Sequence, residues 1–363
     1  MPLHPLIGHR QAKARIVRAH AAGRLPQTIL IAGPAGVGKQ RFALWVAQLL
    51  LCETGRGASR DEPCGTCAAC RKVLNLAHPD LHWLVPIPRP KAGDSDKQVD
   101  EAAETLAAVM AERRESGRWG QSDGMAIHGV ASARLLLRRA ALTSVEGGAK
   151  VFVVGDAERL VPQESSPEAA NALLKLIEEP PRNTVVLLTS AEPDRLLPTV
   201  RSRAIPLRLG RLSSAEVRDY LQREDGKAKG SALEDRVLAA AGAIGRVGEG
   251  GADAATARQA AQAVLSAATA GKRSWIEHAL RQAPWQARGD FSEMLDALGI
   301  LISERARSAR GRSEGLAEAR GRLSGCAEAM AAVEDAREAA RGNVNPQLLL
   351  ASLAGRLEEA MCP

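Results

Sequence analysis

The first 210 residues alternate short apolar runs with stretches of helical periodicity. Such alternation is typical of an α/β domain built on a parallel sheet. One interval, residues 86–124, is polar instead, and we interpret it as an insertion with a helix around residues 100–115 and no assigned function. The pattern predicts strands at residues 28–32, 81–85, 151–154, 185–190 and 205–209.

Helical patterning takes over after the last predicted strand and continues to the C-terminus. Ser213 and Glu216 have the spacing of a capping box, so a helix is expected to begin there. A glycine-rich break follows at residues 242–251, and the last helix is expected at residues 347–361. The chain is therefore predicted to hold one α/β domain and two helical domains, at residues 1–209, 210–271 and 272–363.

Length and charge narrow the class of protein only a little. At 363 residues the chain is long enough for two or three domains. Its 49 basic and 42 acidic residues give a net charge of +7 and a pI near 9.3. This balance is compatible with nucleic-acid contact but does not establish it. Aromatic residues make up only 2% of the chain, which argues against a protein that reads single strands by base stacking.

The N-terminus has no basic flank followed by an apolar stretch, and no apolar run approaches the roughly 20 residues of a membrane helix. We therefore expect a cytoplasmic protein without membrane contact, in which thiols stay reduced. The six cysteines then need an explanation other than disulfides.

Four of the cysteines gather between residues 52 and 70, in a pattern that ends C-x2-C-x2-C. Four thiolates in a reducing compartment are typical ligands of tetrahedral Zn²⁺, and a ligand set supplied wholly by protein indicates a structural site. An iron–sulfur cluster would favour a further cysteine just downstream, where Arg71 and Lys72 stand, and together with unligated cysteines it is the alternative. The predicted zinc ligands are Cys52, Cys64, Cys67 and Cys70, whereas Cys326 and Cys362 are interpreted as single thiols.

A glycine-rich loop connects the first predicted strand to the next helix. Its glycines let backbone N–H groups approach phosphate oxygens, the helix N-terminus adds a favourable dipole, and a lysine can reach the β and γ phosphates. The order of strand, loop and helix indicates a nucleotide-binding P-loop. Its residues are Gly33, Pro34, Ala35, Gly36, Val37, Gly38 and Lys39, and Gln40 follows them.

Two departures from the P-loop pattern affect the Mg²⁺ ion of such a site. The loop normally continues with Ser or Thr, whose hydroxyl binds Mg²⁺, but Gln40 stands there. Acidic residues should directly follow a neighbouring strand, but the first place after residues 151–154 is Gly155, and Asp156 alone is acidic there. Glu158 is interpreted as a solvated surface residue. We therefore predict that ATP hydrolysis is lost, while ATP binding stays open.

Residues 170–181, with the sequence ANALLKLIEEPP, closely resemble a signature of bacterial clamp-loader subunits. Residues 196–203, LLPTVRSR, follow, and Ala204 stands where the family usually has cysteine. Together with the P-loop, the four cysteines and the HPD sequence at residues 78–80, this identifies a resemblance to the delta-prime family of DNA polymerase III clamp-loader subunits. The resemblance is dense over residues 6–209, apart from the insertion, and faint beyond them.

The resemblance implies an AAA+ fold in which residues 210–271 form a helical lid and residues 272–363 a collar that assembles with other subunits. It also implies a hetero-oligomeric, pentameric complex that loads the sliding clamp onto primed DNA for the DNA polymerase III holoenzyme, a DNA-directed DNA polymerase. Active sites of such assemblies lie between subunits, so the resemblance assigns Arg203 as an arginine finger for a neighbour's nucleotide. The chain would then be a scaffold and arginine donor, without ATPase activity of its own.

Two other hypotheses stay open at this point. One is an active motor subunit of the gamma/tau type, against which Gln40 and Gly155 count. The other is an unrelated AAA+ helicase or remodeller, against which the cysteines and residues 178–181 count. Arg246 matches a nucleotide-sensing arginine only weakly. A further group of arginines is interpreted as a solvated helix face rather than a DNA-binding patch: Arg134, Arg138 and Arg139.

Overall fold

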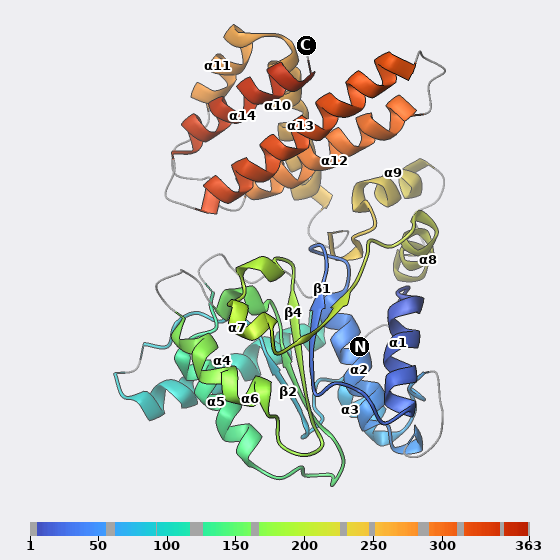
Figure 1. Cartoon of the computed structure of the whole chain (residues 1–363), viewed down its shortest axis with the longest axis vertical. Helices are drawn as coiled ribbons and strands as arrows, with labels where there is room; N and C mark the ends of the chain where they lie inside the picture. The colour runs from blue at the N-terminus through green and yellow to red at the C-terminus, as the bar shows by residue number, and fades with distance from the viewer. Residues whose placement is uncertain are drawn as a thin grey trace. The chain divides into compact units, whose positions relative to one another are not determined.

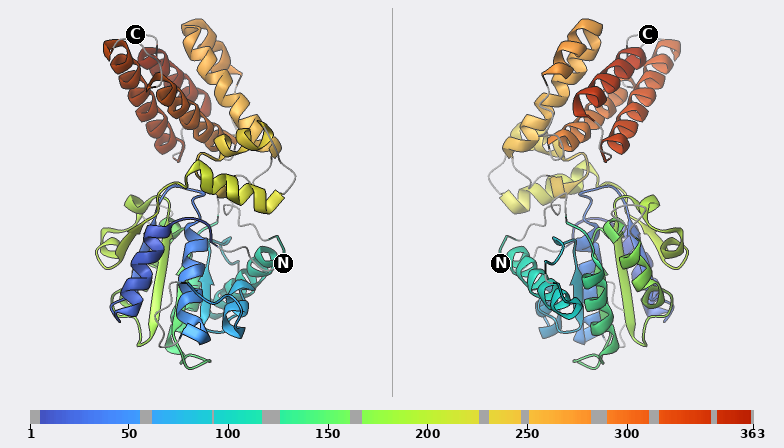
Figure 2. Two further views of the ribbon diagram at one scale, coloured as in Figure 1. Left: turned by 90° about the vertical axis from the view of Figure 1, so that its right-hand side faces the viewer. Right: turned by 90° about the vertical axis from the view of Figure 1, so that its left-hand side faces the viewer.

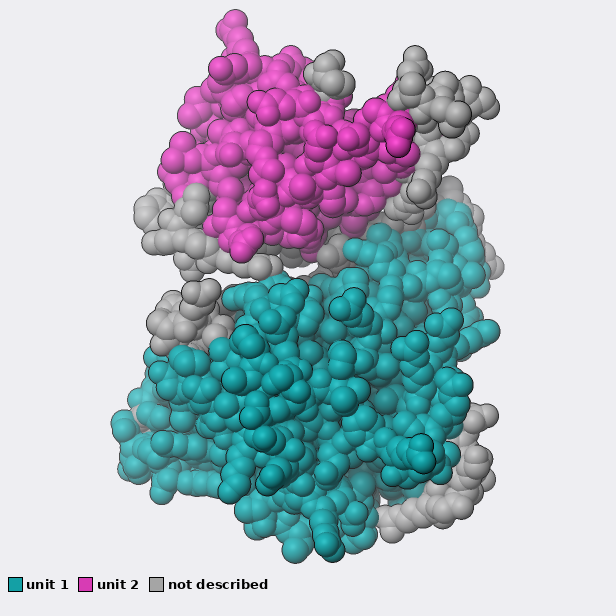
Figure 3. Space-filling model, viewed as in Figure 1, with its two compact units in different colours: residues 1–248 teal, residues 249–363 magenta. Residues whose placement is uncertain are grey.

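The computed structural model describes residues 6–55, 62–91, 93–116, 126–160, 167–225, 231–246, 251–281, 290–310, 316–341 and 345–361. The chain divides into two compact units, Met1–Gly248 and Glu249–Pro363 (Figure 3). In the described residues, two hydrophobic clusters belong to the first unit and one belongs to the second. The predicted domain boundaries after residues 209 and 271 stay predictions.

Five parallel strands form the sheet of the first unit, in the order β2-β3-β4-β1-β5 (Figure 1). Every residue of β1, β3 and β4 is buried, as expected where elements cover both faces of a parallel sheet. The predicted strands are confirmed to within one residue at each end. Their bounds are β1 Thr28–Ala32, β2 Leu81–Leu84, β3 Lys150–Val154, β4 Thr184–Ser190 and β5 Ile205–Arg208.

Helices pack around this sheet. α2 contacts β1, β3 and β4, while α5 lies between α4 and α6, which it contacts in turn. The large side chains of Phe42 and Phe152 are fully buried in the cluster that results. The α-helices are α1 Arg10–Ala21, α2 Lys39–Leu51, α3 Ala68–Leu74, α4 Ser95–Ser116, α5 Val130–Ala141, α6 Glu168–Glu178 and α7 Pro198–Arg201. The short 3-10 helices are η1 Glu53–Gly55, η2 Ala157–Leu160 and η3 Pro193–Arg195.

The predicted insertion contains α4, which is longer than the helix expected at residues 100–115. Its apolar side is buried against the rest of the unit, so the insertion is partly built into the core. Residues 92 and 117–124 of the insertion lie outside the described part of the chain.

After β5 the first unit continues with α8 Ser214–Asp225, α9 Ser231–Ala240 and η4 Ile244–Arg246. The predicted capping box is confirmed, because the Ser213 N–H donates to Oε2 of Glu216 over 2.8 Å and the Glu216 N–H donates to Oγ of Ser213 over 3.3 Å. α8 and α9 bury a small cluster of their own: Leu212, Val217, Leu221, Leu233, Val237 and Ala240.

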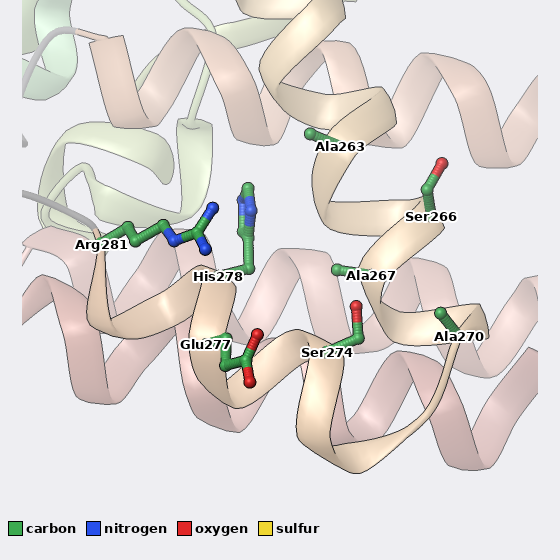
Figure 4. A pocket seen from close by; sticks show the side chains of 8 residues that line it. All are labelled: Ala263, Ser266, Ala267, Ala270, Ser274, Glu277, His278 and Arg281. Carbon is green, nitrogen blue, oxygen red and sulfur yellow. The ribbon is translucent and has the colours of Figure 1, made fainter.

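The second unit is helical in its described residues (Figure 2). Its helices are α10 Gly251–Thr269, α11 Lys272–Leu280, α12 Asp290–Arg310, α13 Leu316–Arg341 and α14 Pro346–Met361. Cys326 is buried in their shared core, and Cys362 lies outside the described residues. A surface pocket of about 380 Å³ lies between α10 and α11 (Figure 4). The pocket is lined by small side chains from α10 and the residue after it, and by polar side chains from α11 and the residue after it. These residues are Ala263, Ser266, Ala267, Ala270, Ser274, Glu277, His278 and Arg281. The predicted class, an α/β domain with a parallel sheet followed by helical regions, is confirmed.

Candidate functional sites: the P-loop, the cysteine cluster and Arg203

The P-loop connects the carboxyl end of β1 to α2, which begins at Lys39. Gly36 and Gly38 have φ angles of 77° and 92°, so the loop passes through the left-handed region that glycine adopts without strain. A β-carbon at Gly33 would overlap the backbone carbonyl oxygen of Leu209, which follows β5. The backbone path itself therefore requires glycine at the predicted positions.

Lys39 is buried, and its Nζ donates hydrogen bonds of 2.9 Å to the carbonyl oxygens of Gly33 and Pro34. Burial lowers the pKa of Lys39, and the charges of Glu158 and Asp156 oppose this effect. The ammonium group is thus held against the loop by backbone carbonyls and lies in the field of two nearby acids.

Gln40 fills the space beside Gly155, the residue that follows β3. Its Nε2 donates to Oδ2 of Asp156 over 3.2 Å, and its Oε1 accepts a hydrogen bond of 2.8 Å from Nη1 of Arg113. A β-carbon at Gly155 would lie 3.0 Å from Nε2 of Gln40. The two departures identified in the sequence are therefore packed against each other, and the structure brings Gln40 and Asp156 together.

Arg113 was not predicted as a site residue, because it lies on α4 within the insertion. It is 6% exposed, and its guanidinium lies 5.4 Å from the centre of the Trp83 ring. Burial lowers the pKa of Arg113 to about 10, so the group remains charged at neutral pH. The sequence does hold a signal for its burial. Apolar residues recur every three or four positions along α4, and Arg113 continues this series on the same side of the helix. The preceding positions on that side are Val99, Ala102, Leu106 and Met110.

The residues at this position do not fit Mg²⁺. The ion binds oxygen ligands in a near-octahedral arrangement. Here the hydroxyl is replaced by an amide, Gly155 offers no carboxylate, and a guanidinium is bonded to the same amide.

The interpretation of Glu158 as a solvated residue is wrong. It is 8% exposed, because η2 turns the chain back toward the end of β4. There the N–H of Ala191 donates to Oε1 of Glu158 over 3.2 Å. Burial, and then the charge of Asp156, raise the pKa of Glu158. The sequence around Glu158 gives no indication that the chain folds back and buries this side chain.

Neighbouring segments of the first unit bond to two backbone carbonyls of the P-loop. The Gly36 carbonyl oxygen accepts a hydrogen bond of 2.9 Å from the N–H of Gly245 in η4. Nε2 of His9, which precedes α1, donates to the Val37 carbonyl oxygen over 2.8 Å. The neighbouring Arg246 has its side chain outside the described part, so its sensing role stays a prediction.

The four predicted zinc ligands converge where α2 ends and α3 begins. Their Sγ atoms all lie within 4.8 Å of one another, with 4.0 Å between Cys52 and Cys67 and 3.8 Å between Cys64 and Cys70. Tetrahedral zinc with Zn–S bonds of about 2.3 Å places its sulfurs about 3.8 Å apart. The cluster therefore fits a zinc ion.

Hydrogen bonds within the cluster favour thiolates at some of these cysteines. The N–H of Cys67 donates to Sγ of Cys64 over 3.3 Å, and the N–H of Cys70 donates to Sγ of Cys67 over 3.4 Å. Hydrogen bonds, that of Thr54 first, lower the pKa of Cys64 to about 5. Burial raises the pKa of Cys70. A bound cation is what would hold all four in the thiolate form.

Arg203 follows the short helix α7, and its side chain is about one third exposed. Its Nε donates to Oε2 of Glu178 over 2.8 Å, and its Nη1 donates to the Thr199 carbonyl oxygen over 3.2 Å. Arg201 pairs instead with Asp194 over 2.6 Å. Both arginines reach the surface, but only Arg203 forms an ion pair with a residue of α6, Glu178 at its C-terminal end.

The solvated arginine face predicted on α5 is confirmed for two of its three residues. Arg134 and Arg138 are exposed, and they bond to Ser95 and Asp96 at the start of α4. Arg139 is half-buried, and burial lowers its pKa, so its interpretation as solvated is wrong. It lies beside Ala140 in the last turn of α5, where the apolar side of the helix faces the core.

Comparison with known families gives the decisive observation. The sequence profile of the family described as DNA polymerase III, delta subunit, matches residues 8–213, more than half of the chain. The chain belongs to this family. The matched residues include the sheet, the P-loop, the cysteine cluster and Arg203.

Individual members of the family are similar at about 30% identity. DNA polymerase III subunit delta' of Pseudomonas aeruginosa is 31% identical over 234 residues, which cover 64% of this chain and 56% of the relative. The delta' subunit of Bacillus subtilis is 28% identical over 202 residues, 56% of this chain and 47% of the relative. The chain thus spans about half the length of the curated relatives it matches. A gamma subunit-related DNA polymerase III protein of Thermotoga maritima is 14% identical, with a TM-score of 0.34 over 97% of this chain and 99% of that one.

The resemblance to the delta-prime family is confirmed by these matches, and an unrelated helicase or remodeller is set aside. The DNA polymerase III subunit gamma/tau of Mycobacterium tuberculosis is 29% identical over 242 residues, which cover 65% of this chain and 34% of the relative. It is a related subunit and not a better match than the delta' relatives. In the described part of the chain, no helix has the length and apolar character needed to cross a bilayer.

Proposed function

We propose that the chain is a delta-prime subunit of a bacterial clamp loader, a cytoplasmic complex that places the sliding clamp on primed DNA for the DNA polymerase III holoenzyme. Family membership supports this proposal. The observation that carries it is a P-loop whose Mg²⁺ position is filled by Gln40 and Arg113, in a chain that keeps an accessible Arg203. Such a subunit contributes structure and an arginine, and other subunits of the complex hydrolyse ATP.

Arg203 is proposed to act on the nucleotide of a neighbouring subunit. In phosphoryl transfer, a guanidinium from a neighbour stabilises charge on the γ-phosphate oxygens in a geometry that lysine cannot copy. Glu178 holds the guanidinium in the isolated chain, and both partners are partly exposed. An exposed ion pair of this kind is worth about 0–1 kcal/mol, so a more highly charged phosphate can replace the carboxylate.

The cysteine cluster is proposed to hold one structural zinc ion, with Cys52, Cys64, Cys67 and Cys70 as its ligands. The four sulfurs leave no position for water or substrate, so the ion would supply folding free energy rather than chemistry. The cluster joins the C-cap of α2 to the start of α3.

Reconstitution of the loader tests the role of Arg203. The chain is combined with gamma/tau and delta subunits, the sliding clamp and primed DNA, and ATP hydrolysis and clamp loading are measured. Arg203→Ala is expected to leave assembly intact and to lower the rate at the site it serves by about 10³-fold. Arg201→Ala, the matched control on the same surface, should change the rate much less. Unchanged activity with Arg203→Ala would leave the chain a scaffold without a catalytic contribution.

A second measurement addresses the chain's own P-loop. The isolated chain is expected to turn over ATP far more slowly than about 1 s⁻¹, the low end of ordinary enzyme rates. Gln40→Thr alone should not rescue hydrolysis, because Gly155 still provides no carboxylate. Steady-state turnover near 1 s⁻¹ by the chain alone would favour a motor subunit of the gamma/tau type instead.

A further inference from the structure

Three side chains from separate parts of the first unit meet at the Mg²⁺ position of the P-loop. Gln40 comes from the first turn of α2, Asp156 follows β3, and Arg113 comes from the last turn of α4. The amide of Gln40 bridges the other two, because it accepts from the guanidinium over 2.8 Å and donates to the carboxylate over 3.2 Å. Through this amide, two hydrogen bonds link a cation to an anion.

Two buried cations lie beside the loop, Lys39 and Arg113. The charge of Asp156 acts on both of them, that of Glu158 acts on Lys39, and that of Glu112 acts on Arg113. A divalent cation added here would lie beside a buried guanidinium of the same sign, in a setting where water screens the repulsion poorly. Reverting Gln40 and Gly155 to metal-binding residues would not remove that charge.

We propose that the guanidinium of Arg113 takes the place of the divalent cation, so that the inserted helix α4 excludes Mg²⁺ from this P-loop. The guanidinium of Arg113 lies 5.4 Å from the centre of the Trp83 ring and donates to Gln40 over 2.8 Å. Any nucleotide phosphate that enters the loop meets Lys39 and Arg113 and is bound without a divalent ion. This inference concerns the chain's own loop and stands whether or not Arg203 acts on a neighbour.

Mn²⁺ is the probe for the test, because the loss of its free-ion electron paramagnetic resonance signal reports binding in the presence of ADP. The starting protein is the full chain carrying Gln40→Thr and Gly155→Asp, which restores a hydroxyl and a carboxylate. Arg113→Met is added to one sample, since methionine keeps a long unbranched side chain and removes the charge. Arg114→Met is added to the matched control, since Arg114 is exposed and adjacent on the same helix.

The Arg113→Met sample is expected to bind Mn²⁺ more than about tenfold more tightly than both the Arg114→Met sample and the starting protein, because a like charge has been removed. Equal affinity in all three samples overturns the proposal, whether the metal binds to all of them or to none. Circular dichroism and zinc content establish that each variant is folded. Arg113→Gln with Arg114→Gln replaces the pair if the methionine variant fails to fold.

The unmodified chain supplies an independent arm that needs no variant. Its thermal unfolding is followed with ADP in the presence of either MgCl₂ or a magnesium chelator. The shift in midpoint caused by ADP is expected to be the same under both conditions, whatever its size. A shift that appears only with Mg²⁺ overturns the proposal.

Discussion

The two ends of α2 differ in whether they can accept a metal ion. The helix begins at Lys39 in the P-loop, and its C-cap is Cys52 in the cysteine cluster. At the cluster, four sulfurs surround a position at the spacing of a tetrahedral ion. At the P-loop, protein side chains occupy the corresponding position and bond to one another.

The difference shows that losing a metal site involves more than deleting ligands. Asp156 remains near the end of β3 and is half-buried, and a carboxylate with reduced access to water is stabilised by a positive partner or hydrogen bonds. Gln40 and Arg113 supply both. Among the described residues, the sulfurs of the cluster bond to backbone N–H groups, to Thr54 and Thr66 and to one another, and none of these partners is a cation. We therefore expect metal removal to affect the cluster strongly and the P-loop hardly at all.

The largest effect that would sharpen this comparison is expected at the cluster. Cys67→Ser should abolish binding of one zinc per chain and lower the free energy of unfolding by several kcal/mol, because metal binding in such sites is folding free energy. Elemental analysis and thermal unfolding measure the two quantities. Cys326→Ser, at a buried thiol of the second unit, should leave the zinc content unchanged. A wild-type chain that carries no zinc, or that carries iron with acid-labile sulfide, would contradict the expectation.

An intermediate effect is expected from the P-loop backbone. Gly33→Ala places a β-carbon against the Leu209 carbonyl oxygen and should lower the free energy of unfolding by about 1–3 kcal/mol. Because the cost arises from packing, it should be the same with and without Mg²⁺. Gly129→Ala is the control, since no atom lies within 4 Å of its added β-carbon. Equal stability of the two variants in urea unfolding would show that Gly33 is not required by the backbone path.

The smallest effect is expected from His128, which is buried and donates from Nε2 to the carbonyl oxygen of Gly155, the residue after β3, over 2.7 Å. Burial lowers the pKa of His128 to about 4, from an ordinary value of 6.5. Between these values the unfolded chain binds more protons, so stability falls as the pH drops, by at most about 1.4 kcal/mol per pH unit from this residue.

His128→Gln keeps a donor for Gly155 and removes the titration. The variant should therefore lose less stability than the wild type between pH 6.5 and 4, as measured by urea unfolding at a series of pH values. His20→Gln changes an exposed histidine and should follow the wild-type curve. Parallel curves for His128→Gln and the wild type would mean that His128 does not contribute to the acid sensitivity.

Local patterns were sufficient for the sheet and for the cysteine cluster. The strands are largely apolar runs, as expected for a parallel sheet that is buried on both faces. The ends of these runs therefore predicted the ends of the strands to within one residue. The four predicted zinc ligands lie within nineteen residues, from the C-cap of α2 to the first turn of α3, so sequence spacing nearly determines their spacing in the fold. The P-loop glycines were predicted for the same reason, since strand, loop and helix are consecutive.

Contacts between distant segments were not predictable in this way. Arg113 reaches Gln40 across 73 positions of the chain, and its helix lies in a segment whose polarity suggested a surface insertion. Glu158 is buried only because η2 folds back to Ala191 at the end of β4. Both depend on the path of the chain in three dimensions. The spacing of apolar residues along α4 marks the buried position of Arg113, but it does not identify the partner.

The bridge formed by Gln40 has a consequence for the evolution of this subunit. Gly155→Asp alone would crowd the Gln40 amide, and loss of Arg113 alone would remove one of the two cations near Asp156. Gln40→Thr alone would remove the link between the remaining two. Because the three side chains share one hydrogen-bond network, the effects of these changes on stability are expected to be non-additive. Under the proposed function, a chain that retains α4 would therefore need several substitutions together to hydrolyse ATP, which would entrench the proposed division of labour among subunits.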